Sequence, residues 1–410
     1  MEAPAAVSLR HVVALDVGSQ SVRCAVAEVV PDRIRIVGVG EVPARGVVRG
    51  VVADPAAASQ AIAEAVEGAE RGSGVEIDQV VVGLGGPHLG CATRQASVRV
   101  LARDGRVGPG DVRRALDQAR SGPAGEGREA LHLVPRSYVV DGGEPVRDPV
   151  GAAGERLDCV AHLVTAATAA TSALVDAVHA AGLAVEDVVA AGLAAAEGVL
   201  RDVELERGVA LVDCGAATTT VVVLAGGAVV HTAVLPVGGR HVSQDLAVGL
   251  RCDPEQAEAV KCRHGSSNPL AAQGSELITL SGPGVLGAHE VSRRLLAEII
   301  EPRVREITRL VGDELGRAEL PGPLARLVLT GGAVCLDGFP ETVHRLLEMP
   351  VRVACPEGLA GLDGQLGHPR HAVAAGLLRW GSRQELRRER HNRRSPGGVG
   401  RMSRWLHDLF

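Results

Sequence analysis

The chain has 410 residues and a formal net charge of −6, with 46% hydrophobic and 22% charged residues. This is the composition of a globular protein of two or three domains, and it gives no reason to expect a nucleic-acid partner. We find no apolar run long enough to span a bilayer and no secretory leader, so we expect neither a spanning nor an exported protein.

Two hairpins in different parts of the chain resemble each other. Residues 11–29 read as a strand, then Asp16-x-Gly18 with small hydroxyl residues, then a second β-branched strand. Residues 208–227 repeat this order around Asp213-x-Gly215. Strand-like and Ala-rich helical patterns alternate between the two hairpins, which predicts a duplicated α/β protein.

The first half of the chain is interrupted between residues 86 and 163. This stretch carries its own strands, at 96–101 and 130–140, around a helix that repeats small and apolar residues from Val112 to Ala119. A link rich in Gly and Pro at 122–127 separates the helix from the second strand. We therefore expect an inserted subdomain.

Three helices and a buried strand follow the second hairpin. We expect helices at 241–250, at about 254–263 and at about 292–314, and a strand at 324–330 that runs into Gly331-Gly332. Adjacent glycines let the backbone approach a ligand closely. The eight cysteines are scattered and form no Cys-x-x-Cys pair, so we expect neither zinc nor disulfides.

The paired Asp-x-Gly hairpins are suited to a magnesium nucleotide. A triphosphate needs backbone N–H donors close to its oxygens, which small residues allow, and Mg²⁺ is held by carboxylates through its waters. Either hairpin alone is more often a simple turn. Together with the strand that ends at Gly331-Gly332, they favour a nucleotide site.

The motifs LDVGSQSVR, VDCGAATTT and VLTGGAV resemble the first phosphate, second phosphate and adenosine motifs of the actin/Hsp70/sugar-kinase superfamily. Within it the chain is similar to the FtsA family of bacterial cell-division proteins from about residue 10 to its end. Further matching stretches are LHLVPRSYVVDG, RDPVG, AEAVKCRHG and AEIIEPRVREI. The resemblance implies an actin-like, ribonuclease-H-like two-domain α/β fold with an inserted subdomain and a C-terminal amphipathic helix.

The same resemblance implies domain boundaries. Subdomain 1A would comprise residues 10–85, 164–196 and 365–382, and the inserted subdomain 1C would be 86–163. Subdomain 2A would comprise 197–242 and 317–364, with 2B at 243–316. A flexible linker at 383–400 would precede the helix at 401–410.

The resemblance also implies roles for individual residues. Asp16 and Asp213 would hold Mg²⁺ through water, and ATP would be the nucleotide. The phosphate contacts would come from Gly18, Ser19, Gln20, Gly215, Thr218 and Thr219, and the nucleoside contacts from Gly331, Gly332 and Ala333. Glu258 and Lys261 would lie against ribose and adenine, and Lys261 is the only lysine of the chain. A surface lysine without a role remains the alternative.

Three departures from the family pattern favour loose binding and slow or absent hydrolysis. Ala216 and Ala217 replace two glycines of the second loop, where each Cβ would crowd a phosphate or forbid a positive φ. Ser21 replaces a lysine of the first loop, and Thr220 stands where an aspartate is common. We assign no catalytic residue.

The last ten residues form an amphipathic pattern. Five apolar side chains share one helical stripe, and Arg401 and Arg404 lie off it. The stripe consists of Met402, Trp405, Leu406, Leu409 and Phe410. We expect it to lie in a membrane interface with Arg drawn to anionic lipid. Its burial yields roughly 5 to 10 kcal/mol, and ordering the helix costs a similar amount. Stable attachment would therefore need self-assembly. Docking on the protein's own core is the alternative.

We expect an ATP-binding adaptor that anchors FtsZ filaments to the cytoplasmic face of the bacterial plasma membrane and recruits division proteins. The resemblance implies that the FtsZ C-terminal peptide meets the long helix near Arg303, although a structural ion pair remains an alternative for this residue. Residues 86–163 would bind other division proteins and further copies of the chain. The rival hypotheses are a pilus-assembly adaptor of the same fold and a sugar-kinase-type phosphotransferase.

Overall fold

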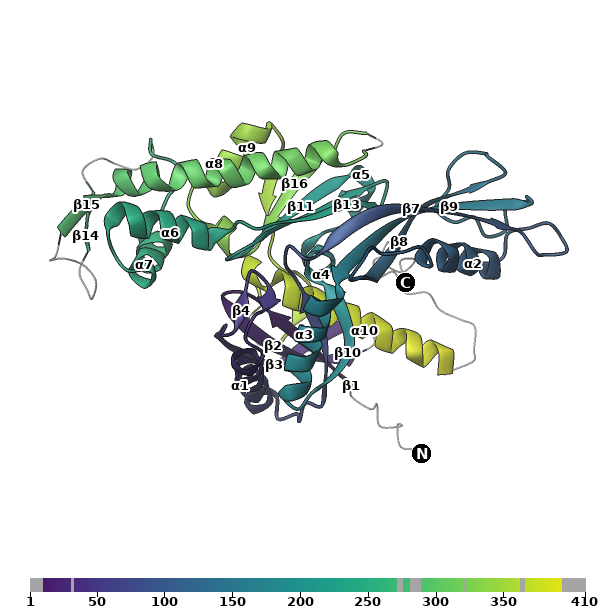
Figure 1. Ribbon diagram of the computed structural model, residues 1–410, viewed down its shortest axis with the longest axis horizontal. Coiled ribbons are helices and arrows are strands. Elements are labelled where there is room, and N and C mark those ends of the chain that lie inside the picture. The colour runs from purple at the N-terminus through teal and green to yellow at the C-terminus, as the bar shows by residue number, and fades with distance from the viewer. Residues whose placement is uncertain are drawn as a thin grey trace, which may run out of the picture.

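The computed structural model describes residues 10–30, 33–270, 276–280, 289–320, 322–361 and 366–392. Two α/β halves and a separate three-stranded subdomain are visible in Figure 1. The predicted membrane helix at 401–410 lies outside the described residues. Within the described ranges, none of the helices is long and apolar enough to cross a bilayer.

The first half is built on a six-stranded sheet in the order β10-β6-β1-β2-β3-β18. Strands β1, β2 and β3 form an antiparallel meander, and β6 and β10 join β1 in parallel. Helix α1 covers one face, beginning after the N-cap Asp54, whose side chain accepts from two backbone N–H groups. The elements are β1 Arg10–Val17, β2 Ser21–Val30, β3 Arg33–Pro43, β4 Val47–Val48, β5 Val51–Val52, α1 Pro55–Ser73, β6 Gln79–Leu84, α3 Thr168–Ala180, β10 Ala184–Ala190, α4 Ala191–Val199 and β18 Leu359–Ala360.

The second half repeats this topology. Its sheet has the order β13-β12-β11-β16-β17, in which an antiparallel meander is again followed by two parallel strands. The repeated order confirms the predicted duplication. The elements are α5 Asp202–Arg207, β11 Val209–Cys214, β12 Thr219–Ala225, β13 Ala228–Leu235, α6 Gly239–Leu250, α7 Pro254–His264, β14 Leu277–Leu280, β15 His289–Ser292, α8 Arg293–Arg317, β16 Arg326–Thr330, the 3-10 turn η1 Gly332–Cys335, α9 Phe339–Leu347 and β17 Val351–Val353.

The inserted subdomain is a three-stranded sheet, β7-β9-β8, with one helix packed against it. It consists of β7 Gly90–Arg99, α2 Pro109–Arg120, β8 Arg128–Val140 and β9 Arg156–Ala167. In Figure 1 it extends to the right of the second half, beside β13. Nε2 of His162, on β9 of this subdomain, lies 3.1 Å from Oγ1 of Thr232 on β13. The insertion thus belongs to the first half in sequence and packs on both halves, since Ala190 N–H of β10 donates to His132 Nε2 of β8.

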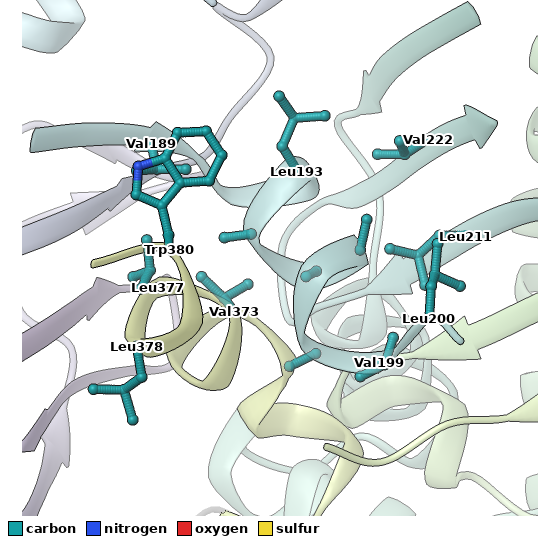
Figure 2. Close-up of a cluster of buried hydrophobic side chains, with 14 of the residues drawn as sticks. Val189, Leu193, Val199, Leu200, Leu211, Val222, Val373, Leu377, Leu378 and Trp380 are labelled. Atoms are coloured by element: carbon teal, nitrogen blue, oxygen red, sulfur yellow. The ribbon is translucent and has the colours of Figure 1, made fainter. Parts of the chain in front are cut away.

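Helices α4 and α10 pack together between the two large sheets. A Cβ added to Gly376 of α10 (Ala372–Asn392) would lie 1.6 Å from the carbonyl oxygen of Ala194, so only glycine permits this approach. Figure 2 shows Leu193 and Val199 of α4 beside Val373 and Trp380 of α10, within the buried cluster that joins both sheets. This shared core fixes the position of one half relative to the other.

Helix α10 corrects the predicted start of the linker. The sequence indicated a flexible segment from residue 383, but the helix continues to Asn392. Arg383 forms a 2.6 Å ion pair with the buried Glu197, and Gln384 donates to Asp187 Oδ2 at 2.6 Å. Arginine, glutamine and glutamate also favour helix, so the charged composition was misread as a linker. Residues 393–400 lie outside the described part of the chain.

Candidate functional site

The two Asp-x-Gly hairpins have the same local geometry. Gly18 N–H donates to Ser21 O at 3.1 Å, and Gly215 N–H donates to Thr218 O at 2.9 Å. These bonds close tight turns directly after β1 and β11. Asp16 and Asp213 occupy equivalent positions near the ends of these strands. Arg23 donates both to Asp16 and to the carbonyl of Arg370, and Gly331, which packs against Asp213, donates its N–H to Pro369 O at 3.2 Å, so the segment 369–370 links the two hairpin ends. The negative charge of Asp16 contributes to the raised pKa of Asp213.

The electrostatics of this carboxylate pair fit a divalent cation. Burial first, and then the charge of Asp16, raises the pKa of Asp213 to about 7. Burial also raises the pKa of Asp16, despite its contact with Arg23. Across the described residues, no group of three or more His, Cys, Asp or Glu could hold a metal by itself. Two carboxylates suit Mg²⁺, which keeps several waters and takes further oxygens from phosphates.

Arg23 provides positive charge beside the first loop. It lies opposite Asp16 in the β1–β2 register, and its guanidinium donates to Asp16 Oδ2 at 3.2 Å and to Glu41 Oε1 at 3.0 Å. It also donates to Ser21 Oγ at 2.7 Å. The charge of Arg23 is therefore balanced by two carboxylates within the protein. Sequence reasoning missed Arg23, although the alternation of a hairpin strand could have placed it on the face of Asp16.

The predicted adenosine motif lies against the second carboxylate. Gly331 follows β16 with φ +88°, and a Cβ there would lie 2.4 Å from Asp213 Oδ1. Gly332 has an ordinary backbone conformation, and a Cβ there would lie 3.7 Å from the nearest atom. The strand β16 pairs in parallel with β11, with Thr330 opposite Asp213. Any side chain at position 331 would overlap the Asp213 carboxylate, so this position requires glycine.

Helix α6 begins on the second phosphate loop. Gly239 N–H donates to Gly215 O at 2.9 Å, and Arg240 N–H donates to Ala216 O at 2.7 Å. The Arg240 side chain reaches the other half of the molecule, where it donates to Ser19 O and, at 3.3 Å, to Gln20 Oε1. Arg240, which the sequence did not single out, therefore joins the two phosphate loops.

Lys261 and Glu258 lie together on α7 beside this helix start. Lys261 Nζ donates to Glu258 Oε2 at 2.7 Å, Ser243 Oγ at 2.9 Å and Gly239 O at 3.1 Å, which uses all three of its donors. Burial alone would raise the pKa of Glu258, but the hydrogen bonds from Lys261 and Ser243 hold it below its usual value. Lys261 therefore orients an ionised Glu258 in the described structure.

The adenosine motif also meets this cluster. A Cβ on Gly239 would lie 3.0 Å from the Cβ of Ala333, so the predicted nucleoside residue lies beside the carbonyl that Lys261 contacts. The structure thus brings together the segments expected to bind phosphate, ribose and base.

The second phosphate loop differs from expectation in two respects. Neither Ala216 nor Ala217 has a positive φ, and Ala217 is 4% exposed, so its methyl group packs into the protein. Thr219 is fully buried, and its hydroxyl donates to Val237 O at 2.8 Å. The expectation that these alanines replace glycines with a positive φ is therefore wrong. The Thr219 hydroxyl already donates its hydrogen to a backbone carbonyl of the protein. Thr218 remains partly exposed at the turn.

Arg303 lies on α8 and is engaged within the chain. Its guanidinium makes a bidentate contact with Asp245 of α6, at 2.7 Å and 2.9 Å, and a further hydrogen bond to Glu306. These contacts raise the pKa of Arg303 above its usual value. The structural alternative left open by the sequence is thus realised. The membrane residues Arg401, Met402, Arg404, Trp405, Leu406, Leu409 and Phe410 lie outside the described residues.

Comparison with known families and proteins gives consistent matches. A family described as "Cell division protein FtsA" matches residues 210–376, and one described as "SHS2 domain inserted in FTSA" matches residues 86–165. The Cell division protein FtsA of Pseudomonas aeruginosa is 35% identical over 92% of this chain and 90% of its own length. That of Escherichia coli K12 is 32% identical over 97% and 98%.

Solved structures share the fold at lower identity. A chain of a PilM-PilN type IV pilus biogenesis complex aligns with a TM-score of 0.65 and 19% identity, covering 90% of this chain and 98% of its own. MreB5 of Spiroplasma citri, solved bound to ADP, aligns with a TM-score of 0.56 and 16% identity, covering 94% and 99%. These alignments and the inserted domain confirm the predicted actin-like fold.

Proposed function

Because the chain belongs to the FtsA family of bacterial cell division proteins, we propose that it is an ATP-binding adaptor that anchors FtsZ filaments to the membrane. Its role lies in cell division, with the division machinery as its partner. The observation that supports the nucleotide-binding part is the pair of equivalent hairpins that carry Asp16 and Asp213, with Gly331 packed against Asp213 and Arg23 linking Asp16 to the segment 369–370 that Gly331 contacts.

In this proposal the two phosphate loops hold the nucleotide. The turns at Gly18 and Gly215 would present backbone N–H groups to the phosphates, and Asp16 and Asp213 would hold Mg²⁺ through water. Bound Mg²⁺ would neutralise the phosphate charge and remove the repulsion between the two carboxylates. Arg240 lies at Ser19 and Gln20 and would supply the positive charge that Ser21 lacks.

The nucleoside would lie between α7 and the turn after β16. Glu258 is held ionised by Lys261, and an ionised carboxylate is suited to accept hydrogen bonds from ribose hydroxyls. Gly332 and Ala333 would face the base. We propose at most slow hydrolysis, because Ser21 and Thr220 stand where the family pattern has a lysine and an aspartate.

The FtsZ-binding part concerns helix α8. The family resemblance points to the surface near Arg303, and an acidic C-terminal peptide would compete with Asp245 and Glu306 for its guanidinium. Such an exchange replaces one carboxylate by another, so it costs less than exposing an unpaired charge. Residues 86–163 would contact other division proteins and further copies of the chain.

The membrane part rests on the sequence of the last ten residues. Their apolar stripe would lie in the cytoplasmic face of the plasma membrane, with Arg401 and Arg404 at anionic headgroups. Weak binding by each tail would be strengthened when subunits assemble into a filament.

Two rival functions remain testable. The structural likeness to the pilus protein supports the fold alone, and the division family is the one that the sequence matches. A pilus adaptor would show no affinity for an FtsZ C-terminal peptide. A phosphotransferase would transfer the ATP γ-phosphate to a small acceptor, which an assay with labelled ATP and a sugar panel would detect.

The deciding experiment is co-sedimentation with liposomes containing anionic phosphatidylglycerol, with and without Mg-ATP and an FtsZ C-terminal peptide. We expect the full chain to pellet and to carry the peptide with it, and Mg-ATP to increase the pelleted fraction. Removing residues 399–410 should abolish pelleting and leave peptide binding in solution intact. Equal pelleting of the shortened chain would refute the anchor, and absence of peptide binding would refute the FtsZ adaptor.

A further inference from the structure

Three residues from distant parts of the chain meet where the inserted subdomain packs on the second half. Cys91 lies at the start of β7, His231 on β13 and Glu314 near the end of α8. Cys91 is exposed, whereas the side chains of His231 and Glu314 are 14% and 10% exposed. The nucleotide site proposed above uses none of them.

The contacts between these residues form a directed chain. His231 Nε2 lies 2.8 Å from Glu314 Oε2, and Glu314 Oε1 accepts from Arg317. Because a carboxylate only accepts, Nε2 of His231 carries the hydrogen of this bond. This leaves Nδ1 as the ring nitrogen available to Cys91, which lies on β7 where that strand packs on β13. The thiol interacts with His231 and Thr232 of β13. A thiol, an imidazole and an orienting carboxylate are thus arranged in sequence.

The surroundings favour the ionised thiol. Burial opposes ionisation, but hydrogen bonds from His231 and from the backbone and side chain of Thr232 hold the pKa of Cys91 below its usual value. The same contact with Cys91, followed by that with Glu314, raises the pKa of His231. Arg317 of α8 is the charged group bonded to Glu314. His162 of β9 interacts with His231 as a neutral imidazole, because burial lowers its pKa to about 3, and Arg136 of β8, which pairs with Glu319, lies near His162.

Two other exposed cysteines provide an internal contrast. Burial raises the pKa of Cys262, which also lies beside the carboxylate of Glu258, and burial likewise raises that of Cys335. Neither has an imidazole oriented by a carboxylate: Cys335 Sγ lies 3.6 Å from His368 Nε2, and the pKa of His368 is lowered by burial. Exposure alone therefore does not distinguish Cys91, whereas the His231–Glu314 pair does.

We propose that Cys91 is a modification site whose thiolate, formed by proton transfer to His231, undergoes exchange with low-molecular-weight disulfides. The Cys91 sulfur attacks one sulfur of the disulfide, so that one S–S bond forms as the other breaks. The departing thiolate takes the proton that His231 holds. The product is a mixed disulfide on Cys91 and one free small thiol, with no net change in the number of electrons.

The adduct would occupy the contact between the inserted subdomain and β13. Cys91 pairs with Val164 in the β7–β9 ladder, while its partner His231 belongs to the second sheet. A mixed disulfide on Cys91 replaces its hydrogen bond with His231 by a bulky group. Modification would thereby loosen the inserted subdomain from β13, one of the segments through which that subdomain touches the second half.

The test uses the reduced full-length protein with oxidised glutathione at pH 7, quenched by acid and analysed by peptide mass spectrometry. We expect mixed-disulfide formation at Cys91 to be about tenfold faster than at Cys262 and Cys335, as a larger thiolate fraction requires. In His231→Asn the Cys91 rate should fall to that of the two other cysteines. Their unchanged rates in the variant would establish that its fold is intact.

A second measurement separates the effect of Glu314 on the reactivity of Cys91 from the effect of solvent exposure. The Cys91 rate in wild type should persist to lower pH than the Cys262 rate, and Glu314→Gln should move the Cys91 profile toward that of Cys262. Hydrogen exchange in β13 should increase after modification. The proposal is overturned if Cys91 reacts no faster than Cys262, or if His231→Asn leaves the Cys91 rate and its pH profile unchanged.

Discussion

Arg23 Nη1 lies 3.2 Å from Asp16 Oδ2, and this contact joins a buried guanidinium to a residue of the candidate nucleotide site. The Arg23 side chain is 8% exposed and also reaches Glu41 and the carbonyl of Arg370. It links the first hairpin to strand β3 and to the segment that precedes α10. The charge balance of the site is thus set partly by a residue outside the phosphate loops.

Arg23→Met should destabilise the protein strongly, because it leaves the carboxylate of Asp16 buried without its cation. We expect a loss of about 3 kcal/mol in the free energy of unfolding, measured by urea titration. Arg45→Met is the matched control, since Arg45 pairs with Glu64 at an exposed site and should cost less than about 1 kcal/mol. Equal losses in the two variants would contradict the role given to Arg23.

Asp213→Asn should make the nucleotide-free protein more stable at neutral pH. The unfolded Asp213 ionises near pH 3.8, whereas the folded one has a pKa of about 7. Between these values the folded state holds a proton that the unfolded state has lost, so the contribution of Asp213 to stability falls as pH rises. With chelator present, the Tm of Asp213→Asn should exceed that of wild type by about 2 to 4 °C at pH 8.

The Tm difference between Asp213→Asn and wild type should shrink steadily as the pH is lowered from 8 to 5. A difference that stays constant over this range would show that Asp213 ionises normally. The same variant should lose Mg-ATP binding, which is measured separately by calorimetry.

Gly331→Ala and Gly332→Ala form a matched pair. At Gly331 a methyl group meets Asp213 Oδ1 at 2.4 Å and φ is +88°, whereas at Gly332 the nearest atom is 3.7 Å away. Gly331→Ala should cost at least about 1 kcal/mol of stability and abolish nucleotide binding. Gly332→Ala should fold normally. Normal nucleotide binding by Gly331→Ala would show that the site does not need this close approach.

Lys261→Met should weaken ATP binding about tenfold, because the loss of one charge-assisted interaction releases Glu258 from its orientation. Lys261→Arg should not restore the affinity, since a planar guanidinium cannot reach three acceptors as the ammonium does. Titration calorimetry measures both, with the exposed Arg263→Met on the same helix as the control. If Lys261→Met binds ATP with wild-type affinity, Lys261 has no role in nucleotide binding.

Ala217→Gly should leave nucleotide affinity unchanged and reduce stability by about 1 kcal/mol. The methyl group of Ala217 is buried, and its backbone has no positive φ that glycine would relieve. The loop motif by itself suggested the opposite result, a gain in affinity. Calorimetry and urea unfolding on the single variant decide between the two, and tighter binding would restore the crowding explanation.

The repeated hairpins were predictable because each depends on residues close in sequence. The strand alternation around Asp16 and Asp213 and the glycines after them specify tight turns without help from the rest of the chain. The segment 383–392 was misread because its composition alone resembles a linker. Its helix is secured by Arg383 and Gln384, whose partners Glu197 and Asp187 lie in the first half.

The duplicated α/β plan, the inserted subdomain and the family of the chain could be predicted from the amino-acid sequence, because repeated local patterns and motif order carry that information. Only the tertiary structure placed Arg240 on the opposite phosphate loop, committed Arg303 to Asp245, and joined Cys91, His231 and Glu314. Such contacts join residues separated by tens to hundreds of positions. They depend on how helices and sheets pack, which no local pattern records.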